Sequence, residues 1–173
     1  MPVIDAVIDR ESLTLTLVAH FDAAPRDVFA VYADPRRLER VWGPPTHPAT
    51  FVAHELAPGR RSTYYMTGPD GTRYPGWWTV RTVDAPASFA FDDGFADEHF
   101  NALPGMPVAH STFRFSPVEG GTRAEYASTY DTADALDQAL DSGLVEGLTS
   151  AINQVDGVIA AFPVKHQVQV PGR

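Results

Sequence analysis

The chain has 173 residues, no cysteine and a formal net charge of −9 at pH 7. That length suits a single domain over residues 1–173, with a core at about 10–162 that needs no disulfides. The absence of cysteine excludes a thiolate nucleophile and a cysteine-ligated metal site. The acidic balance disfavours nucleic acid and anionic membrane surfaces as partners.

The sequence shows neither a signal-peptide pattern at its amino terminus nor an apolar run that could span a membrane. The first segment, MPVIDAVIDRES, lacks a basic region followed by an apolar core, and every apolar run is too short for a membrane span. We therefore expect no stable membrane insertion and predict a cytoplasmic location.

Residues 12–21 alternate apolar with small polar side chains, which predicts a half-buried strand. Its expected inward positions are Leu13, Leu15, Leu17 and Phe21. Residues 1–10 are weakly patterned and are expected to form a loose lead-in. Two short helices should follow the strand, one with Pro25 in its first turn and one from Pro35 to about Trp42.

Further segments rich in β-forming residues follow at 51–56, 61–67, 76–82, 88–91, 108–115 and 122–130. Gly68-Pro69-Asp70-Gly71 is a strong hairpin signal because these residues pre-set the turn torsions. Consecutive short strands predict one antiparallel, meandering sheet of about six or seven strands. The long connection at 92–107 suits either a functional lid or a mobile insertion.

The last long stretch, 131–162, has the pattern of a helix with one buried face. Its apolar stripe is Leu136, Leu140, Leu144, Leu148, Ile152, Val155, Ile159 and Phe162. Asp131 or Thr132 can cap its amino end. One continuous helix would be about 45 Å long. Gly143 and Gly147 should each cost about 1 kcal/mol in its interior, and we favour close packing on a neighbour over open volume as the compensation.

Several segments together resemble a known superfamily. They are Pro25-Arg26-Asp27-Val28-Phe29, Tyr32-Ala33-Asp34-Pro35, Arg40-Val41-Trp42-Gly43-Pro44, Gly68-Pro69-Asp70-Gly71 with Gly76, Asp93-Gly94-Phe95-Ala96-Asp97 and Gly143-Leu144-Val145-Glu146-Gly147-Leu148. In order and spacing the chain resembles the SRPBCC, or START-like (Bet v 1-like), superfamily, in the branch of the activator of Hsp90 ATPase homologue. The resemblance covers roughly residues 10–162.

This resemblance implies an α+β helix-grip fold, in which a curved antiparallel sheet clasps one long carboxy-terminal helix around an apolar cavity. The alternation of side chains along each strand and the aromatic content suggest which residues line that cavity and bind a ligand. They are Trp42, Tyr64, Met66, Trp78, Phe91, Phe95, Phe113, Tyr126, Leu144 and Leu148. Most of these residue types also fill ordinary cores. The region of Trp42 and Trp78 and the 92–107 connection are expected to control entry.

Chemical motifs are sparse. His20, His47, His54, His99, His110 and His166 have no zinc-site spacing, and neither a nucleophile elbow nor a phosphate or dinucleotide loop is present. We therefore predict no metal and no cofactor, and the catalytic residues stay unknown. Side chains that could still move a proton at the cavity are Asp92, Asp93, Glu98, His99, Glu55, Tyr64 and Tyr126.

The leading hypothesis is a protein that binds a small apolar or aromatic ligand between sheet and helix. A cyclase, dehydratase or hydrolase acting on an aromatic or polyketide-like substrate is the alternative from the enzyme class. A chaperone-interacting module is the third. Relatives that stimulate Hsp90 commonly carry an additional amino-terminal domain, and here about ten residues precede the first expected strand, so a full activator role is not expected. The sequence leaves a homodimer open.

Overall fold

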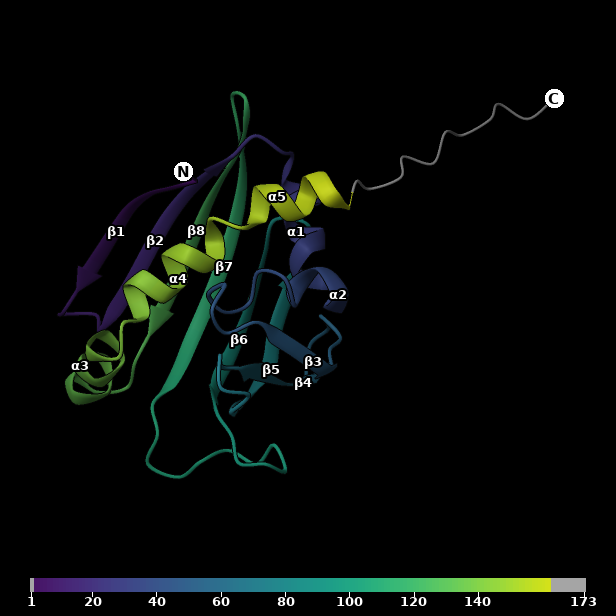
Figure 1. Cartoon of the computed structure of the whole chain (residues 1–173). Helices are drawn as coiled ribbons and strands as arrows, with labels where there is room; N and C mark the ends of the chain where they lie inside the picture. Colours follow the sequence, from purple (N-terminus) through teal and green to yellow (C-terminus); the bar gives the residue numbers. More distant parts are fainter. Residues whose placement is uncertain (1, 163–173) are drawn as a thin grey trace.

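The computed structural model describes residues 2–162. Its sheet is antiparallel throughout and has eight strands in the order β1-β2-β8-β7-β6-β5-β4-β3. The strands are β1 (Val3–Asp9), β2 (Thr14–Phe21), β3 (Ala49–Ala53), β4 (Arg61–Thr67), β5 (Arg73–Asp84), β6 (Ser88–Phe95), β7 (Val108–Val118) and β8 (Gly121–Thr129). The sheet curves around helices that lie across one of its faces (Figure 1). The α+β helix-grip prediction is confirmed, with slightly more strands than expected.

The additional strand is β1, which we expected to be a loose lead-in. It pairs along its length with β2 as the edge of the sheet, although nearly all its side chains are exposed. Exposure on both faces removes the apolar alternation by which a strand is recognised in a sequence. The backbone N–H of Val3 also donates to the side-chain oxygen of Asn153, at 3.1 Å, which joins this edge to the carboxy-terminal helices.

The two short helices are α1 (Pro25–Ala33) and α2 (Pro35–Leu38). Asp34 ends the first and caps the second by accepting a hydrogen bond from the N–H of Arg36. The backbone continues as a helical turn to Trp42, whose N–H donates to the carbonyl of Leu38. Prolines at both helix starts place these turns as predicted, and the side chains of Val28, Val31 and Leu38 are buried in the core.

The carboxy-terminal stretch is helical but divided into α3 (Ala133–Asp141), α4 (Leu144–Ile152) and α5 (Val155–Ala161). The Thr132 side chain, one of the two caps expected from the sequence, caps α3. Gly143 then adopts a left-handed φ of 85°, which ends α3 before α4 begins. The three segments follow one another across the inner face of the sheet (Figure 1). Among residues 2–162, no helix is both long enough and apolar enough to cross a bilayer.

The two glycines of this stretch do not serve close packing, so that prediction is wrong. Gly143 is at the helix break, where its positive φ is the requirement. Gly147 lies inside α4, and a Cβ built on it would meet nothing within 4 Å. The missing side chain therefore leaves open volume beside α4.

Candidate functional site

A cavity of about 450 Å³ lies between the inner face of the sheet and helices α3 and α4. Its floor comes from β6, β7 and β8, and its side walls come from β4, the turn after α2 and the loop before β7. Residues that line it include Tyr32, Val41, Trp42, His47, Tyr64, Met66, Asp93, Phe95, Met106, Ser111, Phe113, Tyr126, Ser128, Tyr130, Gln138, Ser142, Leu144, Gly147, Leu148 and Ile152. Most of these side chains are apolar or aromatic.

The structure brings most of the predicted lining residues together at this cavity. Those that line it are Trp42, Tyr64, Met66, Phe95, Phe113, Tyr126, Leu144 and Leu148. Trp78 and Phe91 do not, so their prediction as lining residues is wrong. Both are fully buried and stack on each other with ring centroids 4.2 Å apart. Trp42 covers them, with its ring centroid 4.6 Å from that of Trp78, and so separates this packed core from the open volume.

Tyr64 can lie in the cavity wall because the residue opposite it on the neighbouring strand is a glycine. Tyr64 and Gly76 are direct partners in the register of β4 and β5. The ring of Tyr64 lies where a Cβ on residue 76 would be, and it stacks on Phe51 with a centroid distance of 5.0 Å. The absence of a side chain at residue 76 therefore creates the place that the tyrosine occupies.

Replacing Gly76 with alanine should lower the free energy of unfolding by about 1–3 kcal/mol, because the added Cβ would overlap the buried Tyr64 ring. Urea unfolding measures the change. The matched control is Gly157→Ala in α5, where the Cβ would meet nothing within 4 Å and stability should rise by up to about 1 kcal/mol. A Gly76→Ala protein as stable as that control would contradict this account of Tyr64.

One carboxyl group, that of Asp93, lies among the apolar lining residues. Burial raises its pKa to about 7, and the negative charge of Asp92 adds to the shift. A hydrogen bond from Ser111 and the charge of His110 act in the opposite direction. Near neutral pH this carboxyl is therefore present in both its protonated and its ionised form, so it can donate a proton or accept one.

Two pairs of hydroxyl groups line the same cavity. Ser111 and Ser128 face each other across β7 and β8 and are hydrogen-bonded at 2.9 Å. The hydroxyls of Tyr32 and Tyr126 form a second buried pair at 2.8 Å. Burial raises the pKa of both tyrosines, so they stay protonated. The cavity thus combines a large apolar wall with a few polar groups that can fix the orientation of a bound molecule.

The comparison with known proteins decides the family. A model for the family "Activator of Hsp90 ATPase homolog 1-like protein" matches residues 22–160. The chain belongs to this family. The resemblance drawn from the sequence motifs is thereby confirmed.

Solved structures of similar proteins cover nearly the whole AHSA1-like chain. The crystal structure of protein Ms6760 from Mycobacterium smegmatis is 52% identical with a TM-score of 0.85, and the match covers 95% of this chain and 100% of that one. A protein from Arthrobacter aurescens, solved by NMR, is 42% identical with a TM-score of 0.88 and coverages of 97% and 99%. The AHSA1 protein from Silicibacter pomeroyi is 25% identical with a TM-score of 0.69 and coverages of 86% and 98%. No functionally curated protein matches the chain.

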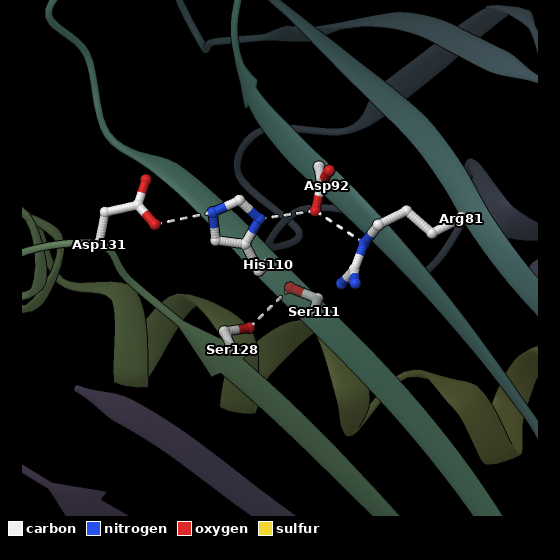
Figure 2. A network of polar contacts seen from close by, with 6 residues as sticks. All are labelled: Arg81, Asp92, His110, Ser111, Ser128 and Asp131. Atoms are coloured by element: carbon white, nitrogen blue, oxygen red, sulfur yellow. Dashed lines mark hydrogen bonds and ion pairs between the residues drawn. The ribbon is translucent and has the colours of Figure 1, made fainter. Parts of the chain in front are cut away.

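On the outer face of the AHSA1-like sheet, a chain of ionic contacts fixes the strand that carries Asp93 (Figure 2). Asp92 accepts a hydrogen bond from His110 at 2.7 Å and forms an ion pair with Arg81 at 2.9 Å, and the other ring nitrogen of His110 lies 3.0 Å from Asp131. The hydrogen bond to Asp92 raises the pKa of His110. Because neighbouring residues of a strand face opposite ways, holding Asp92 outside directs Asp93 into the cavity.

Of the other acid–base candidates, Tyr64 and Tyr126 line the cavity of this AHSA1-like protein, whereas Glu98, His99 and Glu55 do not. Glu98 and His99 are exposed and lie near each other in the loop after β6. Glu55 is exposed and forms an ion pair with Arg60 at 3.1 Å. Over residues 2–162, no three histidine, aspartate or glutamate side chains gather in a way that could hold a metal ion. His166 lies outside the described residues.

Proposed function

We propose that this protein binds a small, largely apolar ligand in the cavity between its sheet and helix α4. The observation that supports this most directly is the cavity itself, with a volume of about 450 Å³ and an aromatic and aliphatic lining. Ligand sites in proteins are commonly clefts of about 300–1,000 Å³ with mostly apolar walls and few polar groups. Its size suits a molecule of one or two fused rings or a short acyl chain.

The proposed entrance is formed by exposed apolar residues at one end of the cavity. Phe95 at the end of β6 is 49% exposed, and Met106 in the loop before β7 is 36% exposed, yet both line the cavity. The side chain of Asp97 organises the intervening loop by accepting hydrogen bonds from the N–H groups of His99 and Asn101. A ligand can therefore enter beside a structured loop that already presents apolar contacts.

Binding can be tested with the neutral fluorescent probe N-phenylnaphthylamine and with a panel of fatty acids, sterols and aromatic polyketides as competitors. We expect the probe to become brighter on binding and to be displaced by panel members of suitable size. A ligand present at about 100 times its Kd should also raise the stability of the protein by about 2.7 kcal/mol. Absence of both probe fluorescence and thermal stabilisation across the panel would contradict the proposed function.

The substitution Gly147→Leu should abolish probe binding while leaving the protein folded. Its side chain would occupy the open volume beside α4, because nothing lies within 4 Å of the position of its Cβ. Removing a glycine from a helix interior should also stabilise the protein by up to about 1 kcal/mol. We expect the Kd of the probe to rise at least about tenfold, which corresponds to about 1.4 kcal/mol.

Gly157→Leu in α5 is the control for this experiment. It removes a helical glycine with equally open surroundings, but this glycine is not part of the cavity lining. Its melting temperature should rise similarly and its probe affinity should stay unchanged. If Gly147→Leu instead lowered stability by a few kcal/mol, the helix would be closely packed at this point and the cavity assignment would be wrong.

A proton-transfer enzyme on an aromatic substrate is the second candidate, and Asp93 is the observation that favours it. Its pKa of about 7 suits a general acid or base at neutral pH, and its charge raises the pKa of Tyr64 and Tyr130 beyond the effect of burial. Recovery of a tight-binding ligand in chemically altered form after incubation would establish this activity. The chaperone-interacting role stays a prediction.

A further inference from the structure

The cavity contains a carboxyl group but no matching cation. Among the described residues that line it, Asp93 is the only carboxylate, no lysine or arginine is present, and His47 at the rim is the only basic side chain. The position of Asp93 is imposed by the alternation of β6, in which Phe89 and Phe91 are buried on the same face. An ionised carboxyl in an apolar cavity is costly unless a positive charge or several hydrogen bonds compensate it.

We propose that the ligand carries a basic nitrogen, whose cation pairs with Asp93 while its apolar body fills the aromatic part of the cavity. This inference rests on the proposed function, because it specifies the chemistry of the ligand for the same cavity. The cation supplies the charge that the lining residues lack. Ser111 supports the ionised form of Asp93 through a hydrogen bond.

The aromatic wall also favours a cationic ligand. Trp42 and Tyr64 lie edge to face with ring centroids 6.0 Å apart, and Phe113 and Tyr126 do the same at 4.6 Å. Ring faces attract ammonium groups, and the attraction increases when the cation is desolvated. An anionic ligand would instead place a second negative charge beside Asp93 in a protein whose net charge is already −9.

The titration of Asp93 gives this pairing a defined pH dependence. Asp92 on the same strand and His110 on β7 shift the pKa of Asp93. The charge of Asp93 in turn raises the pKa of Tyr64 on β4 and of Tyr130 after β8. Helix α3 and the turn after it contribute the uncharged Gln138 and Ser142 to the lining. A ligand cation binds the ionised carboxyl, so its apparent affinity follows the ionised fraction. With a pKa of about 7, that fraction rises about tenfold between pH 6 and pH 8.

Three naphthalene derivatives of similar shape test the inference by isothermal titration calorimetry: naphthylmethylamine, naphthalenemethanol and naphthoic acid. The ammonium group of the amine stays protonated from pH 6 to pH 8. We expect the amine to bind best at pH 8, with an affinity about tenfold higher than at pH 6, and the acid to bind worst. Binding of all three without preference for the amine would overturn the inference and leave the proposed function intact. Failure of all three, together with the neutral fluorescent probe, would contradict the proposed function.

Two isosteric variants locate the effect. Asp93→Asn should remove both the preference for the amine and its pH dependence while retaining the neutral alcohol. Asp92→Asn changes the neighbouring carboxyl on the outer face and should retain the preference for the amine, with the pH profile moved to lower pH because Asp92 raises the pKa of Asp93. If the alcohol bound more tightly at pH 6 than at pH 8 and the amine did not bind, Asp93 would act as a protonated donor to a neutral acceptor, and the proposal of a basic ligand would be wrong.

Discussion

Replacing Trp78 with alanine should lower the free energy of unfolding by about 3–5 kcal/mol. Its side chain is fully buried, and its ring packs against those of Trp42 at 4.6 Å and Phe91 at 4.2 Å. It also contacts Phe51 edge to face at 5.8 Å. The loss therefore combines removal of a large apolar surface with a void that these rings cannot fill. Urea unfolding followed by circular dichroism measures it.

Trp78→Phe and Trp42→Ala are the informative controls for this prediction. The indole N–H of Trp78 has no hydrogen-bond partner within residues 2–162, so phenylalanine gives up no hydrogen bond and should cost far less than alanine. Trp42 is half-buried and faces the cavity, so its truncation should weaken ligand binding more than it weakens the fold. A loss below about 1 kcal/mol for Trp78→Ala would show that its surroundings are open, as our sequence interpretation assumed.

The fold could be predicted from the sequence wherever one face of an element is buried. The alternation in β2, the prolines of α1 and α2, and the Pro69-Asp70 turn all marked elements that the structure contains. The exposed edge strand β1 was missed because it has no buried face to mark it. The division of the last helix was missed because an apolar stripe with a period of four residues continues through Gly143, and this pattern does not show the sign of φ.

The site could be predicted only in part because the inner face of the sheet has two different surroundings. The alternation of side chains along a strand placed Trp78 and Phe91 on the correct face. The alternation cannot show that Trp42 packs on one part of that face while another part borders the cavity. The polar groups were predicted only in part: Asp93 was named as an acid–base candidate at the cavity, and Ser111 was not named. Asp93 was assigned to a loop, whereas the period of two that begins at Phe89 continues through it, and the same alternation from Phe113 leads to Ser111.

The substitution Asp93→Asn should make the protein more stable at pH 8 and leave its stability at pH 4 nearly unchanged. Burial raises the pKa of this carboxyl from its ordinary value of 3.8 to about 7 in the folded protein. A group whose folded pKa is raised contributes stability that is fully present below the unfolded pKa, and this contribution is lost as the pH rises through the folded pKa. The free energy of unfolding attributable to Asp93 therefore falls between pH 3.8 and about 7.

The difference between these two pKa values corresponds to at most about 4 kcal/mol. Because Asp93 faces a cavity that water can enter, we expect the asparagine variant to be about 2–4 kcal/mol more stable than the wild type at pH 8. Urea unfolding at one-unit steps from pH 4 to pH 8 measures both curves. His110 and Asp156 also have raised pKa values, so the wild-type curve contains their contributions, whereas the difference between the two proteins isolates that of Asp93. Parallel curves would mean that the carboxyl is already ionised and well compensated in the folded protein. In that case the wild type would not need a ligand cation to balance its charge.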